Sequence, residues 1–453
     1  MTPTDTTSRW GSLAESLRVS VIGTGYLGTT HAAGMAEMGH QVVGLDVDAE
    51  KVAQLSAGRV PFFEPGLEEV LARGLANGRL RFTTSYADVA ASADIHFVCV
   101  GTPQRSDSNC ADMRFVDAAV RSLAEELTTP CLVVGKSTVP AGSATRLAAL
   151  IHEVAPAGVD ADLAWNPEFL REGHALADTV NPDRLVFGVP NEATQRRLRE
   201  VYATVIDQGC PVIATDLATA ELVKVAANSF LATKISFINA MAEVCEATGA
   251  DVATLALALG HDNRIGPRFL NAGLGFGGGC LPKDIRGFMA RAQELGVEQA
   301  VSFLREVDAI NLRRRARMVD LAVAELDGEV SGRRIGVWGA AFKPDSDDIR
   351  DSPALDVASA LRTWGAEVAV YDPQALDKAR KKYPQLAYCD SARDAARDAD
   401  LILHLTEWAE FRALDPASLD GVVATKQILD GRGALDADLW RSAGWTYRAL
   451  GRP

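Results

Sequence analysis

The sequence has no long uncharged hydrophobic run and no block of basic residues. Its most apolar windows, residues 95–100 and 401–405, end within about six residues, whereas a membrane span needs roughly 20. The 46 Lys and Arg against 60 Asp and Glu leave a formal net charge of −14. An acidic chain of this kind is poorly suited to bind nucleic acid or an anionic membrane. We therefore expect a soluble protein with neither of these as a partner.

Cysteine and histidine are scarce, and their spacing is not that of metal ligands. The 7 Cys are an odd number with no CxxC pair, which argues against a disulfide scaffold or a zinc module. The 7 His show no HxH or HxxxH spacing, so we predict no metal site. Residues 1–17 are polar where a secretory signal needs an apolar core, which predicts a flexible leader. A reduced, cytoplasmic protein fits these features.

Short apolar runs alternate with helical patterns through the first part of the chain. At roughly 150 residues per domain, 453 residues suggest about three domains. Helical patterns cover residues 66–77, 113–127 and 192–207. The strand-like runs between them are rich in Val and Ile and cover residues 18–23, 41–47, 95–103, 131–140 and 185–190. This alternation predicts βαβ units and a parallel sheet covered on both faces.

The strand signal disappears in the middle of the chain and then returns. Residues 217–250 repeat apolar residues at three- and four-residue spacing with no Pro, and with no Gly before Gly249, which predicts a long helix or a broken pair. The predicted fold class is therefore α/β, with two Rossmann-like parallel-sheet domains, 18–214 and 333–453. An all-helical central domain, 215–327, joins them and contains the long helix.

A glycine fingerprint follows the first strand. Gly23, Gly25 and Gly28 form GxGxxG with Tyr26 and Leu27 between the last two glycines, and a helical pattern comes next. Such glycines permit a tight turn, close approach to a pyrophosphate and close packing of helix on strand. A lone GxGxxG can be only a turn, but the strand before it and the helix after it favour dinucleotide binding.

Polar residues at the ends of later strands extend this prediction. Asp46 ends the second strand, where a carboxylate binds the adenine ribose and repels a 2′-phosphate, so NAD is favoured over NADP. Thr102 and Thr138 lie at the carboxyl ends of later strands, the edge where such sheets bind ligands. Lys51 either contacts the ribose or phosphate or is a solvated surface residue.

The second informative feature is a glycine-rich stretch before a cysteine, residues 275–284, which we call the Cys loop. Its glycines allow the backbone to wrap closely around a ligand. Pro282 and the helical pattern after it place Cys280 just before a helix N-terminus, where the helix dipole and Lys283 favour the thiolate. Cys280 is thus a candidate nucleophile, with a structural cysteine as the alternative.

Two further pairs share a four-residue spacing. Glu168 and Glu172 come after a strand-like run, and the Asn-Pro before them favours a turn over a helix. Lys224 and Asn228 share one face of the predicted long helix, where an ammonium and a carboxamide can stabilise an oxyanion. The alternative for both pairs is a solvated surface.

Taken in order, these motifs resemble those of the nucleotide-sugar dehydrogenases, the UDP-glucose/GDP-mannose dehydrogenase family. The resemblance covers about residues 18–432. The matching segments are VIGTGYLG at 21–28, GTP at 101–103, KSTVP at 136–140, NPEFLREG at 166–173, ELVKVAANSF at 221–230, RIGPRFLNAGLGFGGGCLPKD at 264–284, FKPDSDDIRDSPAL at 342–355 and YDP at 371–373. Two departures are Gly279, where many relatives have Ser, and the tail after Arg432, which shows no motif.

The resemblance implies a four-electron oxidation of a sugar C6 alcohol to a carboxylate with NAD as the cofactor. Cys280 would carry a thiohemiacetal and then a thioester, and Lys224 with Asn228 would stabilise the oxyanion. Glu168 would be the base for thioester hydrolysis, with Thr138 and Asp284 positioning water. Either Lys224 or a water held by Asp284 would take the proton of the alcohol.

The resemblance also implies the ligand contacts. NAD would contact Glu172, Lys283 and Arg350 besides the fingerprint. Arg264 matches a position that reaches the neighbouring subunit, which implies a homodimer or a higher assembly. The sugar nucleotide would contact Glu168, Phe169, Leu170, Arg171, Lys224, Asn228, Arg268, Phe269, Leu270, Phe276, Gly277, Phe342, Lys343 and Arg432.

The expected substrate is UDP-glucose. The alternatives are GDP-mannose or a UDP-N-acetyl-hexosamine, because the Cys, Lys and Asn serve the chemistry and not the base or the sugar. Two other classes are a two-electron hydroxyacid dehydrogenase and a non-catalytic NAD sensor. A simple dehydrogenase needs no Cys, and a sensor needs none of Cys280, Lys224, Asn228 and Glu168.

Overall fold

The chain forms two units that are each built on their own sheet. The computed structural model describes residues 16–156 and 159–452, and its compact units are Met1–Ala226 and Ala227–Pro453. Of the predicted leader, residues 1–15 lie outside the described residues. Ser16 and Leu17 are hydrogen-bonded within the first unit, since Ser16 Oγ donates to Gly39 O and Leu17 O accepts from Gln41 N.

The first unit is built on an eight-stranded sheet of order β3-β2-β1-β4-β5-β6-β7-β8. The strands are parallel except that β7 runs antiparallel to β6, so the predicted parallel sheet has one antiparallel pair. The order reverses between β1 and β4, the switch point at which doubly wound sheets bind ligands. The strands are β1 (Arg18–Ile22), β2 (Gln41–Leu45), β3 (Leu80–Thr83), β4 (Ile95–Val98), β5 (Cys131–Gly135), β6 (Ala161–Trp165), β7 (Leu185–Gly188) and β8 (Val212–Thr215).

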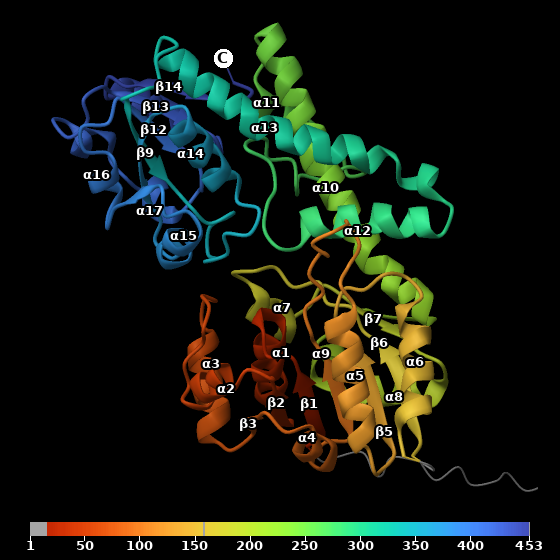
Figure 1. Cartoon of the computed structure of the whole chain (residues 1–453). Helices are drawn as coiled ribbons and strands as arrows, with labels where there is room; N and C mark the ends of the chain where they lie inside the picture. The colour runs from red at the N-terminus through yellow and green to blue at the C-terminus, as the bar shows by residue number, and fades with distance from the viewer. Residues whose placement is uncertain (1–15, 157–158, 453) are drawn as a thin grey trace, which may run out of the picture. The chain divides into compact units, whose positions relative to one another are not determined.

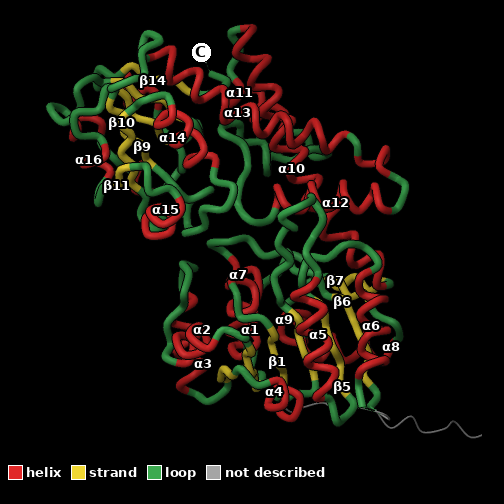
Figure 2. The backbone as a smooth tube through the Cα atoms, viewed as in Figure 1, coloured by secondary structure: helices red, strands yellow, loops and turns green. Residues whose placement is uncertain are grey.

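Helices cover both faces of this sheet (Figures 1 and 2). Because side chains alternate along a strand, Leu132 and Val134 pack into one core while Cys131 and Val133 pack into another. The continuous apolar strands of the sequence are explained by these two cores. The helices are α1 (Tyr26–Glu37), α2 (Ala49–Ser56), α3 (Leu67–Ala76), α4 (Tyr86–Ser92), α5 (Arg114–Glu126), α6 (Ser143–Val154), α7 (Ala175–Val180), α8 (Glu192–Val201) and α9 (Ala203–Asp207).

The long helix predicted for the middle of the chain is a single unbroken helix, α10 (Leu217–Thr248). Its first part belongs to the first unit and the rest to the second. The second unit continues with further helices before its sheet begins. These are α11 (Val252–Gly260), α12 (Leu281–Glu294), the 3-10 helix η1 (Glu298–Val301) and α13 (Phe303–Glu325).

The sheet of the second unit has six strands in the order β11-β10-β9-β12-β13-β14, and every described pair is parallel. Its strands are β9 (Arg334–Trp338), β10 (Glu367–Tyr371), β11 (Ala387–Tyr388), β12 (Leu401–His404), β13 (Gln427–Asp430) and β14 (Thr446–Ala449). Its helices are α14 (Pro353–Thr363), α15 (Leu376–Lys382), α16 (Ala392–Ala395), α17 (Ala409–Arg412), η2 (Pro416–Leu419) and α18 (Ala437–Ser442).

The tail without a recognised motif completes the second unit. It supplies β14, and the residues after it dock on the helices, where Gly451 N donates to Glu246 Oε1 at 3.0 Å. Arg452 Nε lies 2.9 Å from Asp251 Oδ2. In the described part of the chain, no helix is long and apolar enough to cross a membrane.

Candidate active site

The glycine fingerprint forms a cradle at the N-terminus of α1. Gly23 has φ +89°, in the left-handed region that favours glycine, and a Cβ on Gly28 would lie 1.8 Å from Gly23 O. A Cβ on Gly25, the N-cap of α1, would meet no atom within 4 Å. The space beside Gly25 is therefore open next to the N–H groups of a helix terminus, as a diphosphate requires.

Asp46 lies at the end of β2 beside this cradle. Its Oδ2 accepts from Thr24 N at 3.0 Å and from Lys51 Nζ at 2.9 Å. Burial alone would raise the pKa of Asp46, but Lys51 and the backbone N–H groups outweigh burial and hold the pKa below its ordinary value. Asp46 is thus an ionised acceptor where a ribose would bind, and Lys51 is ion-paired to it.

A residue without a sequence signal joins the fingerprint to the NPEFLREG segment. Glu64 is buried, and the Tyr26 hydroxyl donates to its Oε2. Gly173 N also donates to that oxygen, at 2.7 Å. Because the partners lie 38 and 109 residues from Glu64 in the chain, only the fold brings them together.

The ends of neighbouring strands carry the predicted polar residues. Thr102 Oγ1 donates to Thr138 O at 2.7 Å, which joins the loops after β4 and β5. After β6, Glu168 Oε1 lies 2.9 Å from Lys224 Nζ, and both side chains are largely buried. Glu168 Oε2 also accepts from Leu170 N at 2.6 Å, and Lys224 Nζ lies 5.6 Å from the ring centre of Phe169. The segment 166–172 is a loop and not a helix, as the Asn-Pro pattern predicts.

Cys280 is the N-cap of α12 and is exposed. Asp284, in the first turn of that helix, is buried and accepts from Asn228 Nδ2 at 2.6 Å. Lys283 Nζ lies 2.6 Å from Asp284 Oδ1. The structure thus brings three predicted site residues together beside the cysteine, and the Lys283 ammonium is ion-paired with Asp284.

The Cys loop packs so tightly that a side chain does not fit at Gly275 or Gly277. Gly275 has φ +85°, and a Cβ there would lie 2.1 Å from Asn311 Oδ1. A Cβ on Gly277 would lie 2.2 Å from Asp351 O. A Cβ on Gly279 would lie 2.2 Å from Cζ of Arg350, the far end of a flexible side chain. Gly279 therefore permits the Arg350 guanidinium to lie against the loop backbone next to Cys280.

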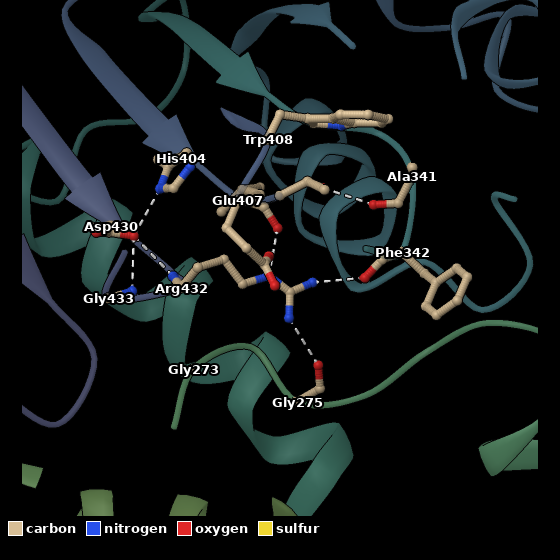
Figure 3. A network of polar contacts seen from close by, with 12 residues as sticks. Gly273, Gly275, Ala341, Phe342, His404, Glu407, Trp408, Asp430, Arg432 and Gly433 are labelled. Atoms are coloured by element: carbon tan, nitrogen blue, oxygen red, sulfur yellow. Dashed lines mark hydrogen bonds and ion pairs between the residues drawn. The ribbon is translucent and has the colours of Figure 1, made fainter. Parts of the chain in front are cut away.

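Arg432 ties the Cys loop to the sheet of the second unit (Figure 3). Its guanidinium donates to Leu405 O at 2.8 Å, Gly275 O at 3.1 Å and Phe342 O at 3.0 Å. Asp430 holds the turn that carries Arg432, because its carboxylate accepts from Arg432 N and Gly433 N, both at 2.9 Å.

Asp430 is itself buried at the end of β13. It also accepts from Tyr447 Oη at 3.0 Å, and His404 Nδ1 lies 2.8 Å from it. Burial alone would raise the pKa of Asp430, but His404 and the backbone N–H groups outweigh burial and lower it. The pair Asp430–His404 had no signal in the sequence.

Several arginines predicted to contact ligands are ion-paired with nearby acids. Arg171 pairs with Asp178, Arg264 with Asp262 and Arg350 with Asp348. The other predicted contacts vary in burial. Leu270 and Phe276 are buried, Leu170, Glu172, Phe342, Lys343 and Arg432 are half-buried, and Arg268 and Phe269 are exposed.

The glycine cradle at the switch point of the first sheet, with Asp46 at the end of β2, is typical of proteins that bind a dinucleotide. The family matches that follow identify the class as NAD-dependent oxidoreductases. The chain belongs to the UDP-glucose/GDP-mannose dehydrogenase family. Residues 17–206 match its NAD binding domain, 218–313 its central domain and 336–437 its UDP binding domain.

Named relatives resemble the chain over nearly its whole length. It is 40% identical over 437 residues to the UDP-glucose 6-dehydrogenase YwqF of Bacillus subtilis, covering 96% of this chain and 98% of the relative. It is also 40% identical to the UDP-glucose 6-dehydrogenase of Rhizobium meliloti, covering 96% and 100%. A UDP-glucose dehydrogenase structure from Pyrobaculum islandicum has a TM-score of 0.88 at 38% identity, with 100% of both chains covered.

Proposed function

We infer that this chain catalyses the NAD-dependent oxidation of UDP-glucose to UDP-glucuronate. The observation that carries this inference is the conjunction of the NAD cradle with an exposed cysteine on a helix N-terminus, in a chain of this family. The balanced reaction is UDP-glucose, two NAD⁺ and one water giving UDP-glucuronate, two NADH and three protons. Each of the two oxidations would use one bound NAD⁺ as the hydride acceptor.

We propose that Cys280 keeps the half-oxidised sugar on the enzyme. Its Sγ adds to C6 of the aldehyde, and the aldehyde oxygen takes a proton to give a thiohemiacetal. Loss of a hydride from C6 and of the hydroxyl proton turns this adduct into a thioester. Water then adds to the thioester carbon, and the C–S bond breaks to release the carboxylate and the thiolate.

We propose the remaining roles from the family resemblance, and the contacts of these residues support them. Lys224 and Asn228 lie one turn apart on α10 and donate to the oxyanion at C6. Glu168, held by Lys224 and Leu170 N, acts as the base that activates water, and Thr138 and Asp284 position that water. Lys224 or a water held by Asp284 takes the proton in the first step.

For the substrate, we propose UDP-glucose ahead of GDP-mannose or a UDP-N-acetyl-hexosamine. The protein is incubated with each nucleotide sugar and NAD, and NADH is counted per mole of sugar consumed. Two NADH from UDP-glucose are expected. One NADH would favour a simple two-electron dehydrogenase, and turnover of GDP-mannose with none of UDP-glucose would refute the substrate.

Two variants test the chemistry. Cys280→Ser should form no net acid, and full four-electron turnover by this variant would disprove covalent catalysis through Cys280. Glu168→Gln should slow thioester hydrolysis, so an acyl-enzyme should be visible by intact-protein mass spectrometry. Wild-type turnover of Glu168→Gln without an acyl-enzyme would reject its role as the base.

We also propose that the protein is a homodimer or a higher homo-oligomer. On α10, Phe230, Phe237 and Val244 recur every seven residues and are 67%, 48% and 53% exposed, which makes one apolar stripe. A second copy of the chain would cover it. Phe237→Glu should shift the molar mass measured by light scattering to that of a monomer, whereas an unchanged mass would place the interface elsewhere.

A cytoplasmic location completes the proposal. The proposed mechanism needs Cys280 as a thiol, and reducing compartments keep exposed thiols reduced. Fractionation of the source cells, with assay of NADH formation from UDP-glucose in each fraction, tests the location.

A further inference from the structure

Lys136 has its ammonium group buried beneath the ligand-binding edge of the first sheet. The residue follows β5 and is 6% exposed. Its Nζ donates to Asn166 Oδ1 at 3.0 Å and to Tyr202 Oη at 3.3 Å, and it lies 6.0 Å from the ring centre of Phe97. Among the described residues, no carboxylate forms an ion pair with it. Burying an ammonium group costs free energy. We therefore expect Lys136 to be needed for its several N–H donors, which it uses on Asn166 and Tyr202.

The ammonium closes a triangle with two other polar groups. Tyr202 Oη donates to Asn166 Oδ1 at 2.7 Å, so this single oxygen accepts from both Lys136 and Tyr202. The Asn166 side chain also donates to Val186 O at 2.9 Å, and its backbone N donates to Gly135 O at 2.8 Å. Asn166, directly after β6, is therefore hydrogen-bonded both to the end of β5 and to β7.

Both loops that leave this junction carry residues of the proposed chemistry. Thr138 lies two residues after Lys136, and Glu168 lies two residues after Asn166. Pro167 stands between Asn166 and Glu168 and restricts the backbone of the residue before it, so the orientation of Asn166 is passed on to the turn. A shift of Asn166 would therefore shift Glu168.

We propose that Lys136 is a positioning residue for thioester hydrolysis, which fixes the turn carrying Glu168 against the turn carrying Thr138 by holding Asn166. This inference rests on the proposed function, which assigns hydrolysis to Glu168 and Thr138. Lys136 acts through Asn166 and not on the substrate, so its loss should affect the step that uses Glu168 more than the steps before it.

The test uses the full chain with UDP-glucose and NAD. In Lys136→Met, the rapid NADH burst should stay near that of the wild type while acyl-enzyme accumulates and hydrolysis slows about tenfold to a hundredfold, as for a misplaced catalytic group. Tyr202→Phe keeps the ring and removes only the hydroxyl from the triangle, so it should change the ratio of NADH burst to hydrolysis in the same direction but by less. This variant carries the test if Lys136→Met fails to fold.

The matched control is another buried side-chain hydrogen bond under the same sheet. Ser20 Oγ lies 2.8 Å from His96 Nδ1, and both residues are buried in strands away from the ligand-binding edge. Ser20→Ala should lower the melting temperature but leave the ratio of NADH burst to hydrolysis unchanged. A structural role for Lys136 would give the same result as this control.

The outcomes separate the inference from the proposed function. Acyl-enzyme in Glu168→Gln but in neither Lys136→Met nor Tyr202→Phe would overturn the positioning role and leave the proposed function intact. If Glu168→Gln and Lys136→Met both hydrolysed the thioester at the wild-type rate, both the positioning role of Lys136 and the role of Glu168 as the base would be refuted. Acyl-enzyme in Glu168→Gln and Lys136→Met, absent in Ser20→Ala, supports the inference.

Discussion

The buried Lys136 predicts an unusual dependence of stability on pH. Burial lowers the pKa of its ammonium from 10.5 to about 8 in the folded protein. Between these two values the unfolded chain still binds a proton that the folded protein has released. The free energy of unfolding therefore rises with pH across this window. Below about pH 8 both states are charged, and the folded state bears the full cost of the buried charge.

The magnitude follows from the difference of the two pKa values. A separation of about 2.5 units at roughly 1.4 kcal/mol per unit gives about 3 kcal/mol. Lys136→Met has no proton to release, so the stability of the wild type relative to this variant should increase by that amount between about pH 7.5 and pH 10.5. Other titrating groups are common to both proteins and cancel in the difference.

The assay is urea unfolding of both proteins across that pH range, followed by circular dichroism and analysed for the free energy of unfolding in water. A difference between the two proteins that rises toward alkaline pH supports a buried, unpaired ammonium. A flat difference, within about 0.5 kcal/mol, would refute the reasoning. It would mean that Lys136 titrates like a hydrated lysine.

Three further outcomes test the NAD cradle, the docked tail and the turn at Arg432. Gly25→Ala should leave the melting temperature unchanged, because its Cβ meets open space, but raise the KM for NAD about tenfold or more by filling the space proposed for the diphosphate. A lower melting temperature with an unchanged KM would contradict this. Burial would raise the pKa of Glu246, but Arg317, Arg314 and the N–H of Gly451 outweigh burial and lower it. Glu246 should therefore stabilise the fold above its unfolded pKa and lose this effect as the pH falls through its lower folded pKa. Glu246→Gln should be less stable by about 1 kcal/mol or less at neutral pH, with the difference disappearing in acid, as thermal unfolding at several pH values would show. Asp430→Asn replaces a carboxylate that accepts several hydrogen bonds by an amide whose NH2 group would face those same donors. It should therefore lower the free energy of unfolding by about 2–4 kcal/mol in denaturant unfolding, and raise the KM for UDP-glucose through the displaced Arg432. Stability and KM equal to those of the wild type would rule out that Asp430 holds the turn that carries Arg432.

Features with a local signal in the sequence were predicted well. The short runs of Val and Ile in the strands and the three- and four-residue spacing of α10 need only neighbouring residues, and the structure has these elements. The fingerprint and the start of α12 at Cys280 are similarly local, because glycines, a proline and a helix pattern specify them. The antiparallel β7 was missed, because strand direction depends on how the connection between strands folds back.

Partners that are distant along the chain had no such signal. Lys136 meets residues 30 and 66 positions away, and both it and Asn166 stood within recognised motifs without an assigned role. Asp430 and His404 lie 26 residues apart on neighbouring strands, where only the pairing of β12 with β13 brings them together. Sequence spacing shows which residues share a face of one element, but not which elements become neighbours.

Local sequence patterns were enough to predict the class of fold, the NAD fingerprint, the candidate nucleophile and the family, because each depends on residue types at short spacing. The pairing of charges and the burial of polar groups, in contrast, could be seen only in the folded chain. The −14 net charge illustrates the division. It indicated no nucleic-acid partner, yet it could not show that Lys224 faces Glu168 while Lys136 faces an amide and a phenol. Pairing and burial depend on strand order and packing, and these arise only when distant segments come together.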